Sequence, residues 1–188
     1  MPHRRMKITA CFLLMLSLTS MAGAAPAESS SQAETLVRAM RSDELAVSAA
    51  KRAFARGAVD GYADASAGCL KKVDYKNFTA RFSHVVDQVL TVSEIETALT
   101  FYQSSAGVKF VEGTFRRLRA SLGEDSWLPK IAGTEDISPE ERDAISAFAS
   151  SDLGRKITGK QMTESPAALQ FGRDMVEEIG QKCSKPKK

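Results

Sequence analysis

Two glutamates at matching positions, Glu94 and Glu141, are the side chains of this sequence that could most directly do chemistry. Two carboxylates that flank a glycosidic bond can act as acid and base, which would suit an enzyme that hydrolyses a cell-envelope polysaccharide. Each glutamate, however, follows a hydroxyl residue by three positions, Thr91 in one case and Ser138 in the other. That spacing is a capping box, in which the glutamate turns back to the first amide of its own helix. We therefore expect both carboxylates to cap helices.

Other side chains that could react are few. His84 is the only histidine besides His3, and it lies in an amphipathic stretch where a partly exposed position on a helix is expected. Ser104 and Ser151 have no base near them in the sequence and are typical of turns. The sequence contains no GxSxG, HExxH, phosphate-loop or EF-hand motif. We predict no catalytic residue, no metal site and no cofactor; whether the protein is an enzyme stays open, with the balance towards a non-enzyme.

Two aromatic residues are candidates for recognition. Tyr102 stands beside Phe101, and Trp127, the only tryptophan, lies in a stretch that is expected to form a loop. Exposed aromatic residues in loops favour binding, whereas burial in the core is the alternative for both residues. We name Tyr102 and Trp127 as predicted binding residues.

The segments that must position these residues are repeated. Residues 91–113 and 138–160 follow one pattern at an offset of 47 residues. Each copy predicts a helix, a tight corner and a second helix. The glycine of each corner would allow close backbone approach or a positive φ. The lysine after it either bridges the corner or, as the default expectation, faces water. The offset pairs Glu94 with Glu141, Phe101 with Phe148, Gly107 with Gly154 and Lys109 with Lys156.

The capping Thr/Ser-x-x-Glu, the aromatic residue after it, and Ser-x-x-Gly followed by x-Lys resemble the DUF2059 family of bacterial exported proteins. The resemblance covers roughly residues 80 to 160, and the second copy departs from it with Ala149 where the first has Tyr102. It implies an all-helical exported protein. It implies no activity, because none is established for that family.

Apolar residues recur at helical spacing in the rest of the chain, and no segment alternates with period two. Further helices are expected over 35–40, from 43 to near Gly68, over 75–90 and from Ser165 to Cys183. The sequence thus predicts an all-α fold, a single compact helical bundle of about six to nine helices over 35–183. A disordered lead is expected at 25–34 and a basic tail at 184–188.

The first 24 residues combine a basic head, an apolar run from Ile8 to Leu18 and a small-residue exit that ends at Ala24. This order is typical of a secretory signal peptide, and the run is too short to span a bilayer. We expect a periplasmic or secreted protein with no transmembrane segment after cleavage. Removal of the signal leaves 23 basic and 23 acidic side chains. This balance lacks the excess of positive charge that is typical of nucleic-acid-binding proteins.

Export also bears on the cysteines. Beyond the signal only Cys69 and Cys183 remain, in a compartment that permits oxidation. A zinc site or a redox pair is the alternative, but the sequence has no CxxC and too few histidines to supply ligands. We predict one structural disulfide that ties the early helices to the last one.

Two hypotheses about function follow. The favoured one is a non-enzymatic exported helical module that binds an unknown protein, peptide or envelope component through a helical groove. The alternative is an envelope hydrolase of the peptidoglycan type that uses Glu94 and Glu141 as its paired carboxylates. Carboxylates that face each other across a cleft would favour the enzyme, and carboxylates folded back onto their own helices would favour the module.

Overall fold

The computed structural model describes residues 26–59, 62, 65–122 and 137–184. Most of these residues are helical and none of them forms a β-strand, which confirms the predicted all-α class. The described residues contain ten helices, more than the expected six to nine, because α3 is a separate short helix and α9 is a separate single turn. In chain order they are α1 (Pro26–Met40), α2 (Ser42–Ala55), α3 (Ala67–Lys72), α4 (Lys76–Val89), α5 (Val92–Tyr102), α6 (Ser105–Leu122), α7 (Pro139–Ser150), α8 (Asp152–Thr158), α9 (Lys160–Thr163) and α10 (Pro166–Cys183).

Helix α1 begins earlier than the sequence indicated. It starts at Pro26, so the segment 25–34, expected to be a disordered lead, is helical from residue 26 onward. Ala33 is fully buried, and Glu34 pairs with Arg38 one turn later at 2.9 Å. The expectation of disorder was wrong because α1 packs along α4 and α5, and tertiary packing stabilises helix even where the composition is polar.

Helix α2 ends well before Gly68, where the sequence had predicted its end. Gly57 adopts a positive φ of 63°, and its N–H donates to the carbonyl of Phe54 at 3.1 Å. The next N–H, that of Ala58, donates to the carbonyl of Ala53 at 2.9 Å. This pair of bonds is a Schellman motif, which stops a helix at a glycine. The predicted long helix therefore ends at Ala55, and helix resumes only at Ala67, where α3 begins close to the predicted end.

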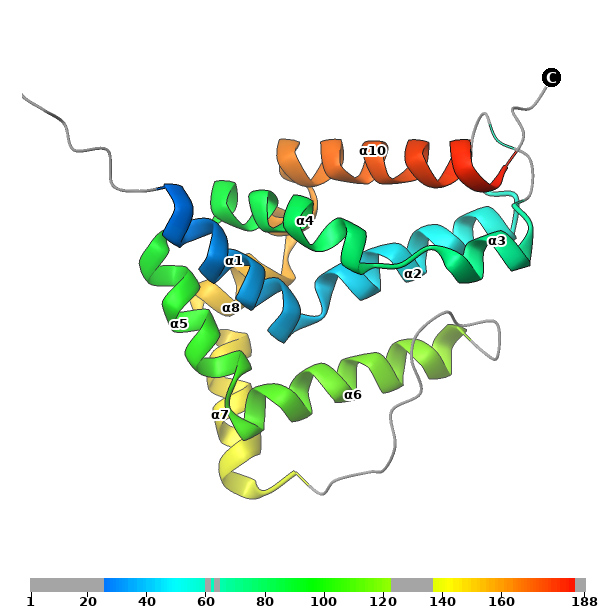
Figure 1. Ribbon diagram of the computed structural model, residues 1–188. Helices are drawn as coiled ribbons and strands as arrows, with labels where there is room; N and C mark the ends of the chain where they lie inside the picture. Colours follow the sequence, from blue (N-terminus) through cyan, green and yellow to red (C-terminus); the bar gives the residue numbers. More distant parts are fainter. Residues whose placement is uncertain (1–25, 60–61, 63–64, 123–136, 185–188) are drawn as a thin grey trace, which may run out of the picture.

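Helices α1, α2, α4 and α10 form one part of the bundle. Helix α1 packs against α4 and α5, and α10 lies along α4 and α2 (Figure 1). The other part contains α5 to α8, in which α6 contacts α5 and α7 while α8 contacts α5, α7 and α9. One buried cluster runs through both parts, and its largest fully buried side chains include Leu36, Phe54, Phe78, Ile95, Phe115 and Ile179.

A disulfide joins α3 to the last residue of α10. Cys69 and Cys183 are bonded, with their Cα atoms 5.4 Å apart, as the sequence predicted. An ion pair between Arg81 of α4 and Glu178 of α10 adds a second link on this side of the molecule. Helix α10 is thus held by its apolar face, by the disulfide and by this ion pair.

Candidate functional site

Both capping boxes are present. The Thr91 N–H donates to the Glu94 carboxylate at 2.7 Å, and the Glu94 N–H donates to Thr91 Oγ1 at 3.3 Å. In the second copy the Ser138 N–H donates to Glu141 at 2.8 Å, and the Glu141 N–H donates to Ser138 Oγ at 3.2 Å. Both glutamates fold back onto the starts of their own helices, so the prediction of capping is confirmed.

The sequence left two roles for the two lysines, bridging the corner or facing water, and the default expectation that they face water was wrong. Lys156 places its Nζ 2.8 Å from both carboxylate oxygens of Glu94, and Lys109 places its Nζ 2.8 Å from Glu141 Oε2. Ser105 Oγ also donates to Glu141 at 2.5 Å. Each lysine therefore binds the capping glutamate of the other copy. The partners are far apart in sequence, which is why a local pattern could not reveal them.

These contacts decide what the glutamates can do chemically. The hydrogen bonds from Lys109 and Ser105, together with the cap, lower the pKa of Glu141 to about 2. The hydrogen bond from Lys156, followed by the cap, lowers the pKa of Glu94 as well. A general acid in glycoside hydrolysis needs a raised pKa that keeps its proton near neutral pH. Both carboxylates are instead ionised and occupied by cations and amides.

The two corners have the same internal geometry. Ser104 Oγ accepts from the Gly107 N–H at 3.1 Å, and Ser151 Oγ accepts from the Gly154 N–H at 2.9 Å. Each serine hydroxyl also donates to the carbonyl of the phenylalanine three residues before it. The serines are therefore turn residues, as predicted, with their hydroxyls occupied locally.

The glycines of the corners permit close backbone approach and not a positive φ. A Cβ on Gly107 would lie 2.6 Å from the Cα of Tyr102, and one on Gly154 would lie 2.8 Å from the carbonyl carbon of Phe148. The sequence had left these two possibilities open. The corners bring Phe101 and Phe148 together in a stack, with ring centroids 3.8 Å apart and an angle of 6° between the planes.

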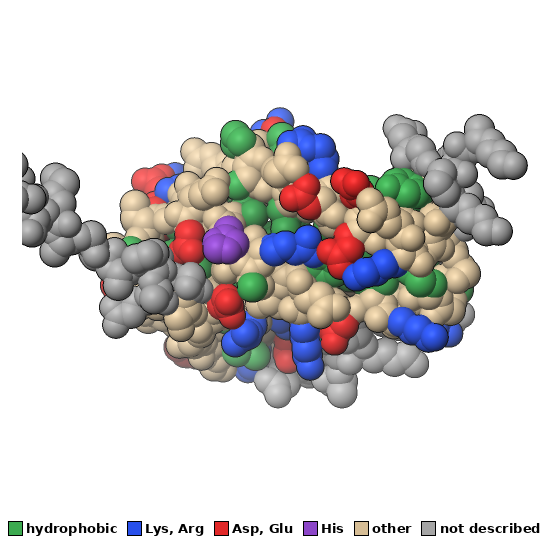
Figure 2. All heavy atoms as spheres, turned by 45° about the horizontal axis from the view of Figure 1, so that its top comes forward, with side chains coloured by type: hydrophobic (Ala, Val, Ile, Leu, Met, Phe, Trp, Pro, Cys, Tyr) green, Lys and Arg blue, Asp and Glu red, His purple; other side chains and the backbone are tan. Residues whose placement is uncertain are grey.

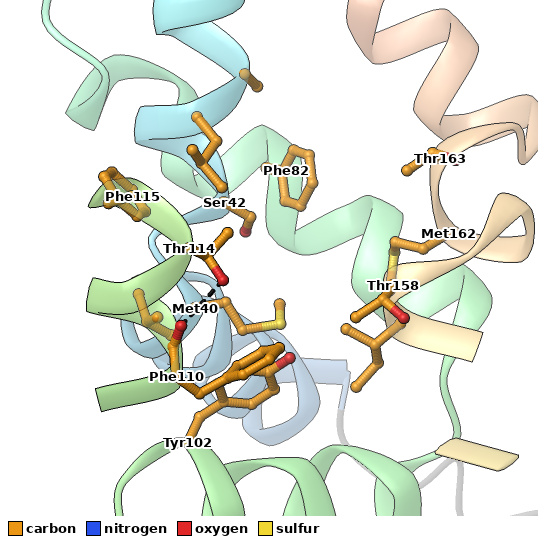
Figure 3. A pocket seen from close by; sticks show the side chains of 14 residues that line it. Met40, Ser42, Phe82, Tyr102, Phe110, Thr114, Phe115, Thr158, Met162 and Thr163 are labelled. Atoms are coloured by element: carbon orange, nitrogen blue, oxygen red, sulfur yellow. Dashed lines mark hydrogen bonds between the residues drawn. The ribbon is translucent and has the colours of Figure 1, made fainter. Parts of the chain in front are cut away.

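Beside this stack lies an apolar cavity of about 400 Å³ that is partly open to solvent and is lined by residues of seven helices. Figure 3 shows its walls: Met40 and Ser42 come from the α1–α2 junction, and Thr158 and Met162 face them from α8 and α9. None of the fourteen lining side chains is charged. The lining residues are Met40, Ser42, Leu45, Ala46, Phe82, Tyr102, Phe110, Val111, Thr114, Phe115, Ile157, Thr158, Met162 and Thr163.

Tyr102, one of the two predicted binding residues, lies in the wall of this cavity. Only 4% of it is exposed, and its ring packs against Phe101 at 5.2 Å between centroids. Burial raises the pKa of its hydroxyl to about 12, so the hydroxyl stays protonated. Its hydroxyl points into the space between the walls (Figure 3). Trp127, the other predicted binding residue, lies outside the described residues.

The junction between α1 and α2 is unusual in its backbone. Arg41 has φ 53° and ψ 32°, the left-handed conformation that non-glycine residues rarely adopt. Its guanidinium forms two hydrogen bonds to Glu44, at 2.9 and 2.7 Å, and lies 4.2 Å from the centroid of the Phe115 ring. This sharp junction places Met40 and Ser42 on the same cavity wall. Strained backbone of this kind is concentrated at functional sites.

One further acidic group is buried next to the junction. Asp43 is 1% exposed; its carboxylate accepts from Thr79 Oγ1 at 2.5 Å and from the Glu44 N–H at 2.9 Å. Burial raises its pKa, and these two hydrogen bonds oppose the rise. The contact ties α2 to α4 behind the cavity wall, and we assign it a structural role.

The outer surface near α4 and α10 carries no single-sign patch. Figure 2 shows acidic and basic side chains interspersed on this face. His84 is exposed, in agreement with its prediction as a surface residue of a helix. The described residues contain no cluster of ligands suited to a metal ion, and none of the described helices is long and apolar enough to cross a membrane.

Comparison with protein-family models, with curated proteins and with solved structures finds no match for this chain. The assignment of this cavity as a candidate ligand site therefore depends on its geometry alone. The sequence singled out only Tyr102 among its fourteen lining residues. The others come from separate helices whose apolar positions are indistinguishable, in sequence, from core positions.

Proposed function

We propose that this protein is an exported, non-enzymatic helical module that binds an apolar part of an envelope component or peptide. The observation that carries the proposal is the cavity of about 400 Å³ between the α1–α2 junction and α8–α9. Ligand pockets in proteins have volumes of about 300 to 1,000 Å³ and are mostly apolar with a few polar groups.

Export is the second part of the proposal, and two features support it. The basic head and apolar run of residues 1–24 are those of a signal peptide. The disulfide between Cys69 and Cys183 is of the kind that persists in oxidising compartments. The repeated corner motif, with its resemblance to the DUF2059 family, favours the same location.

The envelope hydrolase with Glu94 and Glu141 remains the second candidate, and the contacts of those residues count against it. A retaining or inverting mechanism needs one protonated carboxyl group beside the substrate. Lysine contacts lower the pKa values of both carboxyl groups, and both accept from helix-start amides. We therefore build the proposal on the cavity.

Thermal unfolding of the exported protein, with its disulfide intact, tests the proposal against lipids, apolar peptides and peptidoglycan fragments. A ligand at a hundred times its dissociation constant adds about 2.7 kcal/mol to the free energy of unfolding, which is a visible shift. The substitution Ala46→Phe fills the cavity from α2 and is expected to abolish that shift. Ala49→Phe, on the exposed face of the same helix, is the matched control and should leave it intact.

Two results would contradict the proposal. One is the absence of any shift with every apolar ligand. The other is a shift that survives Ala46→Phe, because the ligand would then bind elsewhere.

The same thermal-unfolding assay tests the predicted role of Trp127 in binding. Trp127→Ala should weaken binding if that residue contacts the ligand.

A further inference from the structure

We propose that the ligand of the cavity is an uncharged acyl group: an aliphatic chain whose ester or amide carbonyl accepts a hydrogen bond from the hydroxyl of Tyr102. This inference rests on the proposed function and names the chemistry of its ligand. The evidence for it is the hydrogen bonding of the hydroxyl groups in the cavity lining. Some of these hydroxyl groups already have a partner in the protein, and others have none.

Three of the five hydroxyl groups in the lining are already used. Thr114 donates to the carbonyl of Phe110 at 2.9 Å, and Thr158 donates to that of Gly154 at 2.8 Å. Thr163 likewise donates to a carbonyl within its own turn, at 3.2 Å. Threonines that bond back to their own helix in this way present methyl groups rather than donors to the cavity.

The remaining two hydroxyls lack such partners, and only one of them is open to the cavity. Ser42 Oγ is fully buried and has no partner among the described residues, so a ligand in the cavity does not reach it. The Tyr102 hydroxyl makes no hydrogen bond to another described residue, and it points into the cavity (Figure 3). An acceptor on a ligand would take the place of water there and form a hydrogen bond in apolar surroundings. Because Tyr102 keeps its proton, it acts as a donor and calls for an acceptor on the ligand.

The ligand group must also be uncharged. No basic side chain lines the cavity, and two cations of the helices that line it are engaged: Arg41 with Glu44, and Lys156 with Glu94. A carboxylate moved into this space would lose its hydration without gaining a counter-charge, which is strongly unfavourable. An ester or amide carbonyl accepts the same hydrogen bond without that cost.

An aliphatic chain suits the remaining surface. Met40 and Met162 lie on opposite walls, and methionine side chains adapt to flexible apolar ligands. A cavity of about 150 Å³ already holds benzene. The space here, about 400 Å³, is larger than a single ring needs and accommodates a chain.

The experiment compares three probes with the same twelve-carbon chain (a chain length chosen as about what the cavity can hold), each below its critical micelle concentration. They are 1-dodecanoylglycerol, its ether analogue 1-O-dodecylglycerol, and dodecanoate at a pH where it is ionised. Affinity is measured by titration calorimetry on the exported protein with its disulfide intact. The ester is expected to bind about three- to tenfold more tightly than the ether, which is the effect of one hydrogen bond. Dodecanoate is expected to bind more weakly than the ester.

A variant assigns the effect to the hydroxyl. Tyr102→Phe should weaken ester binding by about three- to tenfold and leave ether binding nearly unchanged. Tyr62→Phe removes a tyrosine hydroxyl that does not line the cavity and is the matched control. If Tyr102→Phe disturbs the fold, the comparison of ester with ether on the unaltered protein carries the test by itself.

The outcomes separate this inference from the function on which it rests. Equal binding of ester and ether, or tightest binding of dodecanoate, overturns the acyl carbonyl while the apolar binding module stands. Binding of apolar peptides but of none of the three probes also overturns the acyl group and leaves the module. Failure of every apolar ligand, with no effect of Ala46→Phe, overturns both.

Discussion

At the scale of single residues, the two corner glycines allow the two helices of each copy to approach each other closely. Gly107 has no room for a side chain because the backbone of Phe101 and Tyr102 crosses directly over it, and Gly154 is crossed in the same way by Phe148 and Ala149. Only a residue without a Cβ lets the second helix begin so close to the first. This approach sets the position of Phe101 and of Tyr102 beside the cavity.

The substitution Gly107→Ala is therefore expected to destabilise the protein by about 1 to 3 kcal/mol or more, because the new methyl group meets backbone atoms that cannot move aside. Gly113 is the matched control, since it lies in the same helix and a Cβ there meets nothing within 4 Å. Gly113→Ala should stabilise the protein by about 0.5 to 1 kcal/mol. Urea unfolding of the two variants measures both effects; equal effects of one sign would contradict the close approach.

The residue scale also shows what the sequence could and could not predict. The capping of Glu94 by Thr91 was predictable because the partners lie three residues apart, a spacing that only helix geometry brings together. The bond from Lys156 to Glu94 spans 62 residues, and no local pattern encodes such a contact. Gly57 lay inside a helical apolar pattern, so its role as a helix stop was visible only once the Schellman bonds were seen.

At the scale of elements, the second helix of each copy packs against the first helix of the other. Helix α6 contacts α7, and α8 contacts α5. The ion pairs join the same pairs of helices: Lys109 of α6 binds Glu141 of α7, and Lys156 of α8 binds Glu94 of α5. Helix α7 itself contains no buried residue, so its attachment depends on these contacts and on the stack of Phe148 with Phe101.

This arrangement predicts a loss of stability in acid. The folded pKa of Glu141 is about 2 against a reference of 4.5, and that of Glu94 is lowered too. A carboxyl group with a depressed folded pKa contributes stability that is fully present above its unfolded pKa and is lost as the pH falls through its folded pKa. The free energy of unfolding should therefore decline as the pH falls from 4.5 towards about 2.

Chemical unfolding at several pH values in that window measures the decline. Lys109→Met removes the leading cause of the lowered pKa of Glu141 and should make the pH dependence shallower. Lys160→Met is the control, because Lys160 pairs with Glu164 in an exposed contact within one short segment. A decline as steep in Lys109→Met as in the unaltered protein would show that the reciprocal pairs do not contribute.

At the scale of the whole molecule, the cavity belongs to no single segment. Its walls come from seven helices that span Met40 to Thr163, and it exists only because the sharp junction at Arg41 and the two corners fix how those helices meet. The sequence could predict that the fold is helical, since helix periodicity is local. It could not predict where helices leave space between them, because that depends on packing between distant elements.

The disulfide acts at the same scale, since it closes a loop with a sequence separation of 114 residues that contains α4 to α9. A cross-link over such a loop stabilises the fold mainly by restricting the unfolded chain, by up to about 4 to 5 kcal/mol. The double variant Cys69→Ser/Cys183→Ser should lose stability by up to that amount in urea unfolding. It should keep its helical circular dichroism, because α10 still buries Phe171, Met175 and Ile179. Reductant should lower the urea midpoint of the unaltered protein to that of the double variant and leave the midpoint of the variant unchanged. Equal urea midpoints of the two proteins before reduction would mean that the disulfide adds nothing to the stability of the fold.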